Sequence, residues 1–115
     1  MPVERERDGQ DSQAHHVLVL CLEMAVGTGR CRLFGEVGKM ERIAVDAAMR
    51  GRGVGRLIME ALEAWALEQG ATVARLASQD SALTFYECLG YQAHGEAFMD
   101  AGISHRWMDK CLGRG

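Results

Sequence analysis

The pattern of apolar and polar positions predicts that the first half of the chain forms strands. Short apolar runs occupy residues 16–23, 30–37 and 39–46, and glycine-containing segments separate them. Runs of this length between turn residues are typical of strands, and three in close succession indicate an antiparallel meander. The glycines at 27–29 mark either a turn or a bulge within the second strand. Residues 1–14 are charged and show no periodicity, so we expect a flexible arm there.

The second half of the chain predicts helices that alternate with strands. Ile58, Leu62 and Trp65 recur at helical spacing, which predicts a helix over residues 56–69 that ends at Gly70. The remaining predicted elements are a strand over 72–77, a helix over 81–89 capped by Asp80 or Ser81 and ended by Gly90, and two strands over 91–95 and 104–112. Between the last two strands, residues 96–103 are expected to form a loop, although a helical turn also fits.

These elements follow the order β-β-β-α-β-α-β-β, which indicates an α/β protein with a mixed sheet flanked by helices. The strands over 39–46 and 72–77 are joined by a helix, so we expect a parallel pair with a right-handed crossover. The length of 115 residues suits a single domain over residues 1–115.

Composition narrows the class of protein. With 48% apolar and 25% charged residues the chain is expected to fold and to be soluble, and a net charge of −3 argues against a nucleic-acid binder. No apolar run is long enough to span a membrane, and the polar start is no signal peptide, so we expect a cytoplasmic protein. The four cysteines and four histidines lack metal-ligand spacing, and no metal site is expected. Cys21 and Cys31 could face each other across a hairpin, although free buried thiols are the simpler interpretation.

One segment, AAMRGRGVGRLIME over residues 47–60, points to chemistry. Three glycines and three arginines lie between a predicted strand and a predicted helix. Backbone N–H groups at such a helix start bind anions, and glycine lets a phosphate approach closely. The alternative is a plain turn with a basic helix cap, but arginines there oppose the helix dipole. The segment fits neither a Walker A loop nor the dinucleotide-binding fingerprint.

The segment matches the pattern R-x-x-G-x-G, from Arg50 to Gly55, and here the chain resembles the GNAT N-acetyltransferase superfamily. SALTFYECLGY, residues 81–91, is similar to a second signature of that family, and GEAFMDAGISHRWM, residues 95–108, resembles its ElaA-like branch. The resemblance covers about residues 39 to 110. It implies a mixed sheet whose two central parallel strands splay apart to admit the pantetheine arm of acetyl-coenzyme A.

The resemblance also assigns roles to particular positions. It implies that the backbone of the central strand binds the pantetheine amides, that the glycine-arginine loop holds the pyrophosphate, and that one glutamine stands where many members have a cofactor-contacting asparagine. The corresponding cofactor residues are Ile43, Ala44, Val45, Arg50, Gly51, Arg52, Gly53, Val54, Gly55, Arg56 and Gln79.

Three further side chains are candidates for the transfer chemistry. Tyr86 stands where the family has a tyrosine often proposed to protonate the departing thiolate, although it could equally be a core aromatic. Glu41 is the candidate base, because a carboxylate on the same face as Ile43 and Val45 would be partly desolvated and its pKa raised; the alternative is an ion-paired glutamate. His105 is a candidate acceptor-side residue or a structural histidine.

The chain departs from the family at its start. Typical members carry another strand and one or two helices before the segment that begins near residue 15, and these elements form one wall of the acceptor pocket. Two functions therefore stay open: acetyl transfer to the primary amine of a small molecule or peptide, or coenzyme A binding without turnover. A third is a structural partner in which the loop is only a turn. An exposed first strand would also invite a homodimer.

Overall fold

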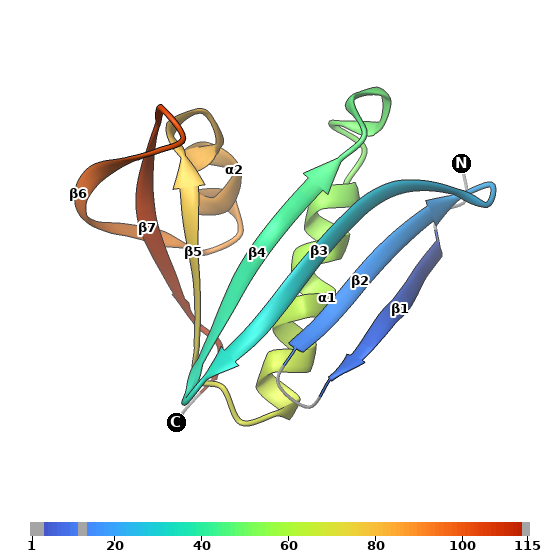
Figure 1. Cartoon of the computed structure of the whole chain (residues 1–115), viewed down its shortest axis with the longest axis horizontal. Helices are drawn as coiled ribbons and strands as arrows, with labels where there is room; N and C mark the ends of the chain where they lie inside the picture. The colour runs from blue at the N-terminus through green and yellow to red at the C-terminus, as the bar shows by residue number, and fades with distance from the viewer. Residues whose placement is uncertain (1–3, 12–13, 114–115) are drawn as a thin grey trace.

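A single mixed sheet of seven strands runs through the computed structural model, which describes residues 4–11 and 14–113 (Figure 1). The strand order is β1-β2-β3-β4-β5-β7-β6. The strands are β1 (Glu4–Asp11), β2 (Ala14–Cys21), β3 (Met24–Phe34), β4 (Val37–Val45), β5 (Val73–Gln79), β6 (Gln92–Asp100) and β7 (Ile103–Cys111). The helices are α1 (Val54–Glu68) and α2 (Leu83–Cys88), each preceded by a 3-10 turn, η1 (Ala47–Met49) and η2 (Asp80–Ala82).

The sheet opens in the middle. The predicted meander is confirmed, since β2, β3 and β4 pair antiparallel, and the predicted parallel pair is β4 with β5. That parallel pairing joins only Val37–Lys39 to residues 73–75, after which the two strands diverge as the arms of a V (Figure 1). This splay between the central strands is the one that the GNAT resemblance implies.

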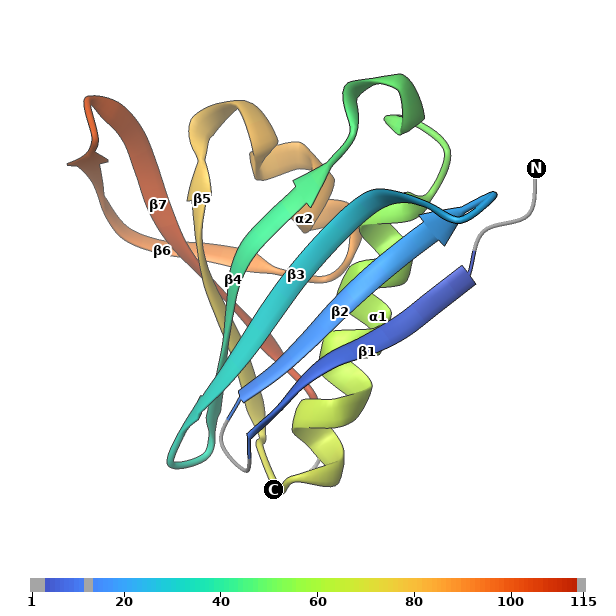
Figure 2. The same ribbon diagram turned by 45° about the vertical axis from the view of Figure 1, so that its right-hand side comes forward.

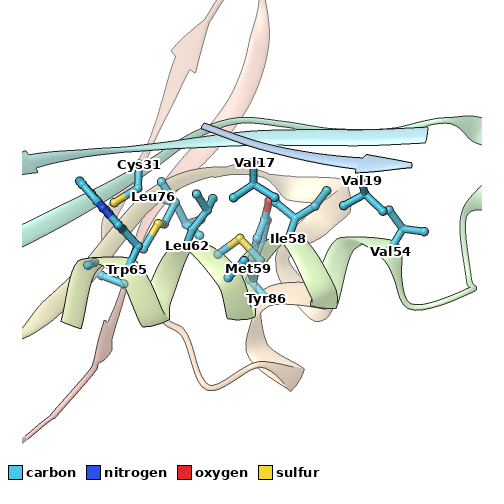
Figure 3. Close-up of a cluster of buried hydrophobic side chains, with 14 of the residues drawn as sticks. Val17, Val19, Cys31, Val54, Ile58, Met59, Leu62, Trp65, Leu76 and Tyr86 are labelled. Carbon is cyan, nitrogen blue, oxygen red and sulfur yellow. The ribbon is translucent and has the colours of Figure 1, made fainter. Parts of the chain in front are cut away.

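Helix α1 packs against β2, β3 and β4, and both helices cover the same face of the sheet (Figure 2). Ile58 and Leu62 of α1 are completely buried, with Val17 and Val19 of β2 opposite them (Figure 3). A Cβ on Gly29 of β3 would lie 2.6 Å from Cγ2 of Ile58. The glycines at 27–29 therefore lie within β3, where they let α1 approach the sheet, rather than in a turn. The bulge alternative is confirmed next to these glycines, because the register shift between β2 and β3 leaves Val26 as an extra residue of β3 beside Gly27.

Three predictions about local structure were wrong. Residues 4–11 form β1 and pair with β2 instead of forming an arm, because an edge strand is held by backbone hydrogen bonds and needs no apolar periodicity; residues 1–3 and 12–13 lie outside the described residues. Residues 96–100 belong to β6 rather than to a loop, and the turn is confined to Ala101 and Gly102. Neither Asp80 nor Ser81 caps α2, which begins directly from η2 without a side-chain cap.

Other local predictions are confirmed. Gly70 and Gly90 follow the ends of α1 and α2 with φ of 95° and 101°, a conformation that costs glycine little. The cysteines are free. Cys21 and Cys31 are buried as expected, whereas Cys88 and Cys111 are exposed.

Candidate active site

The opening of the V places one edge of β4 beside open space. Ala44 and Val45 pair with β3 on one side, but β5 pairs with β4 no further than Lys39 among the described residues. Backbone groups along this edge are therefore free to bind an extended ligand, as an added strand would be bound. The position agrees with the one predicted for the pantetheine arm.

A bulge in β4 divides the predicted site residues between two faces. Arg42 has φ of 56°, and Arg42 with Ile43 stands opposite the single residue Gly29 of β3. The extra residue reverses the alternation, so Ile43 faces α1, where its Cδ1 would lie 2.8 Å from a Cβ on Gly29. Glu41 lies on the opposite face. The expectation that Glu41 shares a face with Ile43 and Val45 was therefore wrong.

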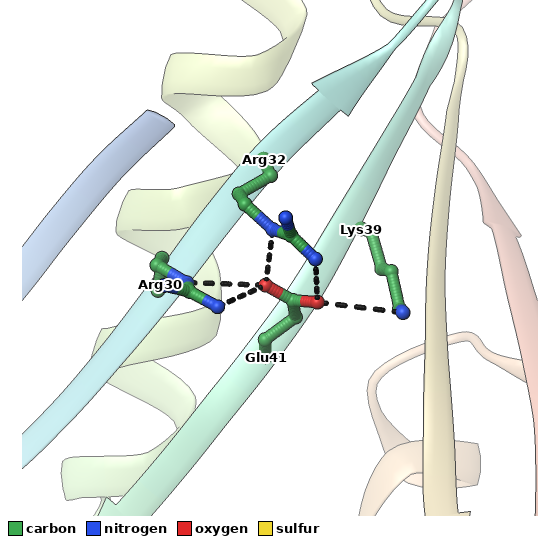
Figure 4. Close-up of polar contacts among 4 residues, drawn as sticks. All are labelled: Arg30, Arg32, Lys39 and Glu41. Atoms are coloured by element: carbon green, nitrogen blue, oxygen red, sulfur yellow. Dashed lines mark hydrogen bonds and ion pairs between the residues drawn. The ribbon is translucent and has the colours of Figure 1, made fainter. Parts of the chain in front are cut away.

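Glu41 is held by cations on that opposite face (Figure 4). Arg32 donates from Nε and Nη2 to the two carboxylate oxygens at 2.7 and 2.8 Å, Arg30 donates from Nε and Nη2 to Oε1 at 3.1 and 2.8 Å, and Nζ of Lys39 lies 3.4 Å from Oε2. The hydrogen bonds from Arg32, reinforced by those from Arg30, outweigh burial and lower the pKa of Glu41 to about 2. The predicted rise in its pKa was wrong, and so was the argument that made it a base.

The glycine-arginine loop presents backbone donors at the start of α1. Gly53 caps the helix in the left-handed region with φ of 82°, Gly51 has φ of 79°, and no side-chain cap bonds the first turn. The first bonded amide of the helix is that of Leu57, which donates to the carbonyl of Gly53. The amides of the preceding residues 54–56 therefore point outward unpaired within the described residues, as an anion site requires.

The arginines of the loop surround these amides with positive charge. Arg50, Arg52 and Arg56 are all exposed. Arg56 lies 3.9 Å from Glu60 in a solvent-exposed pair, and no ion pair engages Arg50 or Arg52 within the described part of the chain. The loop therefore has charge available for an anionic ligand.

Gly55 has a different role from the other two glycines. A Cβ at Gly51 or Gly53 would meet nothing within 4 Å, so those positions need glycine for their backbone angles. At Gly55 a Cβ would lie 2.8 Å from Cζ of Phe85 in α2. The third glycine thus allows the two helices to touch.

Tyr86 lies in the core beside α1. The residue is 9% exposed, and its ring meets those of Phe85 and Tyr91 edge to face, with centroids 4.9 and 5.9 Å away. Figure 3 shows it in the same cluster as Met59 and Ile58. Burial raises the pKa of its hydroxyl, so the group keeps its proton at neutral pH.

The structure brings Gln79 and His105 together, although they are 26 positions apart in the sequence. They are register partners in β5 and β7. His105 also stacks on Phe98 at 5.8 Å, and its Nδ1 lies 2.8 Å from the carbonyl oxygen of Ile103. Both residues lie at the open end of the V, at the end of β5 and near the start of β7.

Sequence reasoning missed the partners of Glu41 and the role of Arg75 in β5. The signal for the first was present, because Arg30 and Arg32 alternate with buried positions in a strand that was expected to pair with residues 39–46. Arg75, which bonds Asp109 of β7 through two hydrogen bonds at 2.8 and 2.9 Å, had no comparable signal. Its partner depends on which strand lies beside β5.

No group of three or more histidine, cysteine, aspartate or glutamate side chains in the described residues is arranged to hold a metal ion. No helix among these residues is long and apolar enough to cross a membrane.

Comparisons with known proteins agree with this geometry. The family of acetyltransferase (GNAT) domains matches residues 3–112. The uncharacterized N-acetyltransferase YjcF of Bacillus subtilis is 41% identical over 111 residues, which are 96% of this chain and 79% of that protein.

Two solved structures share the fold. The crystal structure of Escherichia coli ElaA superposes with a TM-score of 0.74 at 24% identity, over 84% of this chain and 68% of that one. The aminoglycoside 6′-N-acetyltransferase complexed with coenzyme A has a TM-score of 0.80 at 16% identity, over 90% and 75% of the two chains.

Proposed function

The chain belongs to the GNAT acetyltransferase family, and from that premise we propose that it transfers an acetyl group from acetyl-coenzyme A to the primary amine of a small molecule. The observation that carries the proposal is the unpaired edge of β4 at Ile43–Val45, which leads through η1 directly to the glycine-arginine loop. One extended ligand with an anionic end would fit both features. Acetyl-coenzyme A has this form.

The cofactor would lie with its pantetheine arm along β4 and its pyrophosphate on the start of α1. The arm would add to β4 as an extra strand through the backbone of residues 43–45. The pyrophosphate would accept hydrogen bonds from the amides of residues 54–56, and Arg50 and Arg52 would supply charge. Gln79 at the end of β5 is positioned on the other arm of the V for an additional contact.

The transfer would proceed by direct attack within a ternary complex. The neutral amine nitrogen attacks the thioester carbonyl carbon and loses one proton to water, the carbon–sulfur bond breaks, and the thiolate takes up a proton. Holding both reactants in line supplies much of the acceleration. Tyr86 is our candidate for the proton donor, because its buried hydroxyl stays protonated at neutral pH. Glu41, with its lowered pKa, is not assigned the role of base.

The proposal is tested by equilibrium binding of acetyl-coenzyme A to the purified chain, measured by calorimetry for the wild type and for Gly53→Val. A β-branched residue is strained at φ of 82° and would displace the amides that follow, so we expect at least about a tenfold loss of affinity. Gly35→Val is the matched control, since Gly35 also has positive φ with nothing within 4 Å of a Cβ but lies in the β3–β4 turn.

Removal of the pyrophosphate from the ligand identifies the group that the loop binds. We expect pantetheine to bind much more weakly than coenzyme A to the wild type and about equally to Gly53→Val. Equal loss of affinity in Gly53→Val and Gly35→Val, or no binding by a folded wild type, would contradict the proposal.

A further inference from the structure

A second concave site lies on the face of the sheet that α1 and α2 leave uncovered. It is a pocket of about 570 Å³ at the vertex of the V, lined by Phe34, Val37, Lys39, Arg75, His94 and Trp107. Its face is defined by alternation along β4: a Cβ on Gly38 would lie 3.0 Å from Ala66 of α1, so the neighbouring Lys39 points to the other side. Lys39 and Arg75 are the last paired residues before β4 and β5 separate.

The polar lining of this pocket consists of nitrogen groups. Lys39, Arg75 and His94 line it, and no carboxylate does. In the surrounding ion-pair network of the described residues, four arginine or lysine side chains face two carboxylates, and Oδ1 of Asp109 also lies 3.1 Å from Nε2 of His94. The cations are Arg30, Arg32, Lys39 and Arg75, and the carboxylates are Glu41 and Asp109. This local excess of positive charge contrasts with the net charge of −3 for the whole chain.

The cations that line the pocket keep donors for a ligand. Arg75 uses Nε and Nη2 to bind Asp109, which leaves Nη1 without a hydrogen-bond partner among the described residues. Lys39 lies 3.4 Å from Glu41 in an ion pair and makes no hydrogen bond within the described part of the chain. A ligand carboxylate placed between Arg75 and Lys39 would accept hydrogen bonds from Nη1 of Arg75 and from Nζ of Lys39.

The other walls are flat and apolar. Nζ of Lys39 lies 5.5 Å from the ring centroid of Trp107, and that ring stacks on Phe98 at 5.4 Å, so its orientation is supported from β6. Phe34 is 52% exposed and Val37 lies near it in the lining. An aromatic or other planar group would cover these side chains, while a small hydrated anion would leave them in water.

We propose that this pocket binds the acceptor by a carboxylate attached to a flat apolar body, so that the acceptor class is amines of the aromatic amino-acid type. Simple cationic polyamines are disfavoured because Lys39 and Arg75 repel them. The assignment to the acceptor rests on the proposed function, because the pocket lies at the vertex of the same V that would hold the cofactor. The preference for an anion with an apolar body rests on the pocket alone.

The test uses 3-phenylpropionate as the probe, without coenzyme A, and follows the indole N–H signals of the two tryptophans by NMR. We expect the signal of Trp107 to shift and to saturate. Trp65 of α1 lies on the other face, stacked on His15, and its signal is the internal control. We expect 3-phenylpropionamide and 3-phenylpropylamine to bind at least about tenfold more weakly, because they lack the anionic group.

Two variants identify the cation that recognises the probe. We expect Lys39→Gln to weaken binding about tenfold and Lys39→Arg to retain it. Lys110→Gln is the matched control, because it removes the same charge from the neighbourhood of Tyr91 and Glu63, away from the pocket. Thermal unfolding of each variant shows whether it is folded.

Three results would overturn the proposal. Inorganic phosphate or 3-phenylpropionamide could bind as tightly as 3-phenylpropionate, or Lys39→Gln and Lys110→Gln could weaken the binding of 3-phenylpropionate equally. These outcomes do not depend on the cofactor. A chain that binds the probe at Trp107 but fails to bind acetyl-coenzyme A would refute the proposed transferase function and leave the anion-selective pocket in place. A chain that binds acetyl-coenzyme A and acetylates neutral amines in preference to aromatic amino acids would refute the acceptor assignment.

Discussion

At the scale of single residues, Glu41 illustrates how neighbours decide the role of a titratable group. A carboxylate beside apolar residues is expected to have a raised pKa, and on that basis it was a candidate base. The structure instead surrounds it with Arg30, Arg32 and Lys39. The resulting network stabilises the ionised form, so Glu41 contributes to the stability of the sheet rather than to proton transfer at neutral pH.

The lowered pKa of Glu41 predicts a particular dependence of stability on pH. Because its pKa falls from 4.5 to about 2 on folding, the stabilisation is fully present above the unfolded value and is lost as pH decreases toward 2. Solvent screening limits the effect, and we expect the wild type to lose about 1–2 kcal/mol more than Glu41→Gln between pH 5 and pH 2. Denaturant unfolding at several pH values measures this difference. Parallel pH profiles would show that the ion pairs contribute nothing.

For Tyr86 the expected effect is on turnover. If its hydroxyl protonates the thiolate, Tyr86→Phe should lower kcat about a hundredfold and leave the affinity for acetyl-coenzyme A nearly unchanged. Tyr91→Phe is the matched control, because Tyr91 is also buried and its hydroxyl donates to Glu63 at 2.8 Å. Steady-state kinetics with any amine that the enzyme acetylates gives kcat and KM for both variants. An equal decrease in both variants would indicate a packing role for Tyr86.

At the scale of elements, the bulge in β4 decides which side chains enter the V. Before Arg42 the even-numbered residues face α1, and after it the odd-numbered ones do, so Met40, Ile43 and Val45 all pack into or against the core. The same irregularity turns Glu41 toward the uncovered face. A single left-handed residue thus separates the unpaired edge of β4, the proposed cofactor site, from the ion-pair network.

The bulge carries backbone strain that a substitution should relieve. Arg42 is exposed, has φ of 56° and makes no ion pair within the described residues, so Arg42→Gly is expected to stabilise the fold by about 1 kcal/mol. Arg42→Ala keeps the strain and is the control, and Arg42→Val should destabilise. Free energies of unfolding from urea titrations test whether stability decreases from Arg42→Gly through Arg42→Ala to Arg42→Val. A less stable glycine variant would contradict this account of the bulge.

At the scale of the whole molecule, the two halves of the sheet are joined along a short seam. Only three residues of β4 pair with β5, so the rest of the connection comes from α1, α2 and the core between them. One such link is Lys110 of β7, which reaches Glu63 of α1 at 2.8 Å. This arrangement holds the V open while keeping its arms in a common core.

Hydrogen exchange should report the occupation of the V. In the free protein, amides on the unpaired edge of Ile43–Val45 should exchange rapidly because no strand covers them. Acetyl-coenzyme A should slow the exchange of at least one of these amides about tenfold or more. The exchange rates of the amides of Val37–Lys39, which already pair with β5, should change little. Mass spectrometry or NMR can follow both sets. Uniform protection across the sheet would indicate global stabilisation rather than an added strand.

Most local elements, and the glycine-arginine loop as a candidate anion site, were predictable from neighbouring residues. The helix over residues 56–69, the three-stranded meander and the parallel crossover follow from periodicity and from turn residues, which are properties of neighbouring positions. The loop was recognisable because glycines and arginines before a helix have few purely structural explanations. Strand β1 was not recognisable from the sequence, because an edge strand is held by hydrogen bonds to the backbone of its neighbour and needs no apolar pattern of its own.

Tertiary structure alone decided which side chains meet. The bulge at Arg42 reversed a face, and no residue type at that position announces it, since arginine is rare in the left-handed region. The order of β7 and β6 beside β5 placed Asp109, Trp107 and His94 around Arg75, which created the pocket. These contacts join positions up to 68 residues apart in the chain, from Lys39 to Trp107, and depend on strand order and register. Local patterns of apolar and polar residues predicted the meander and the parallel crossover, but not the order of β7 and β6 beside β5 or the register shift at Arg42.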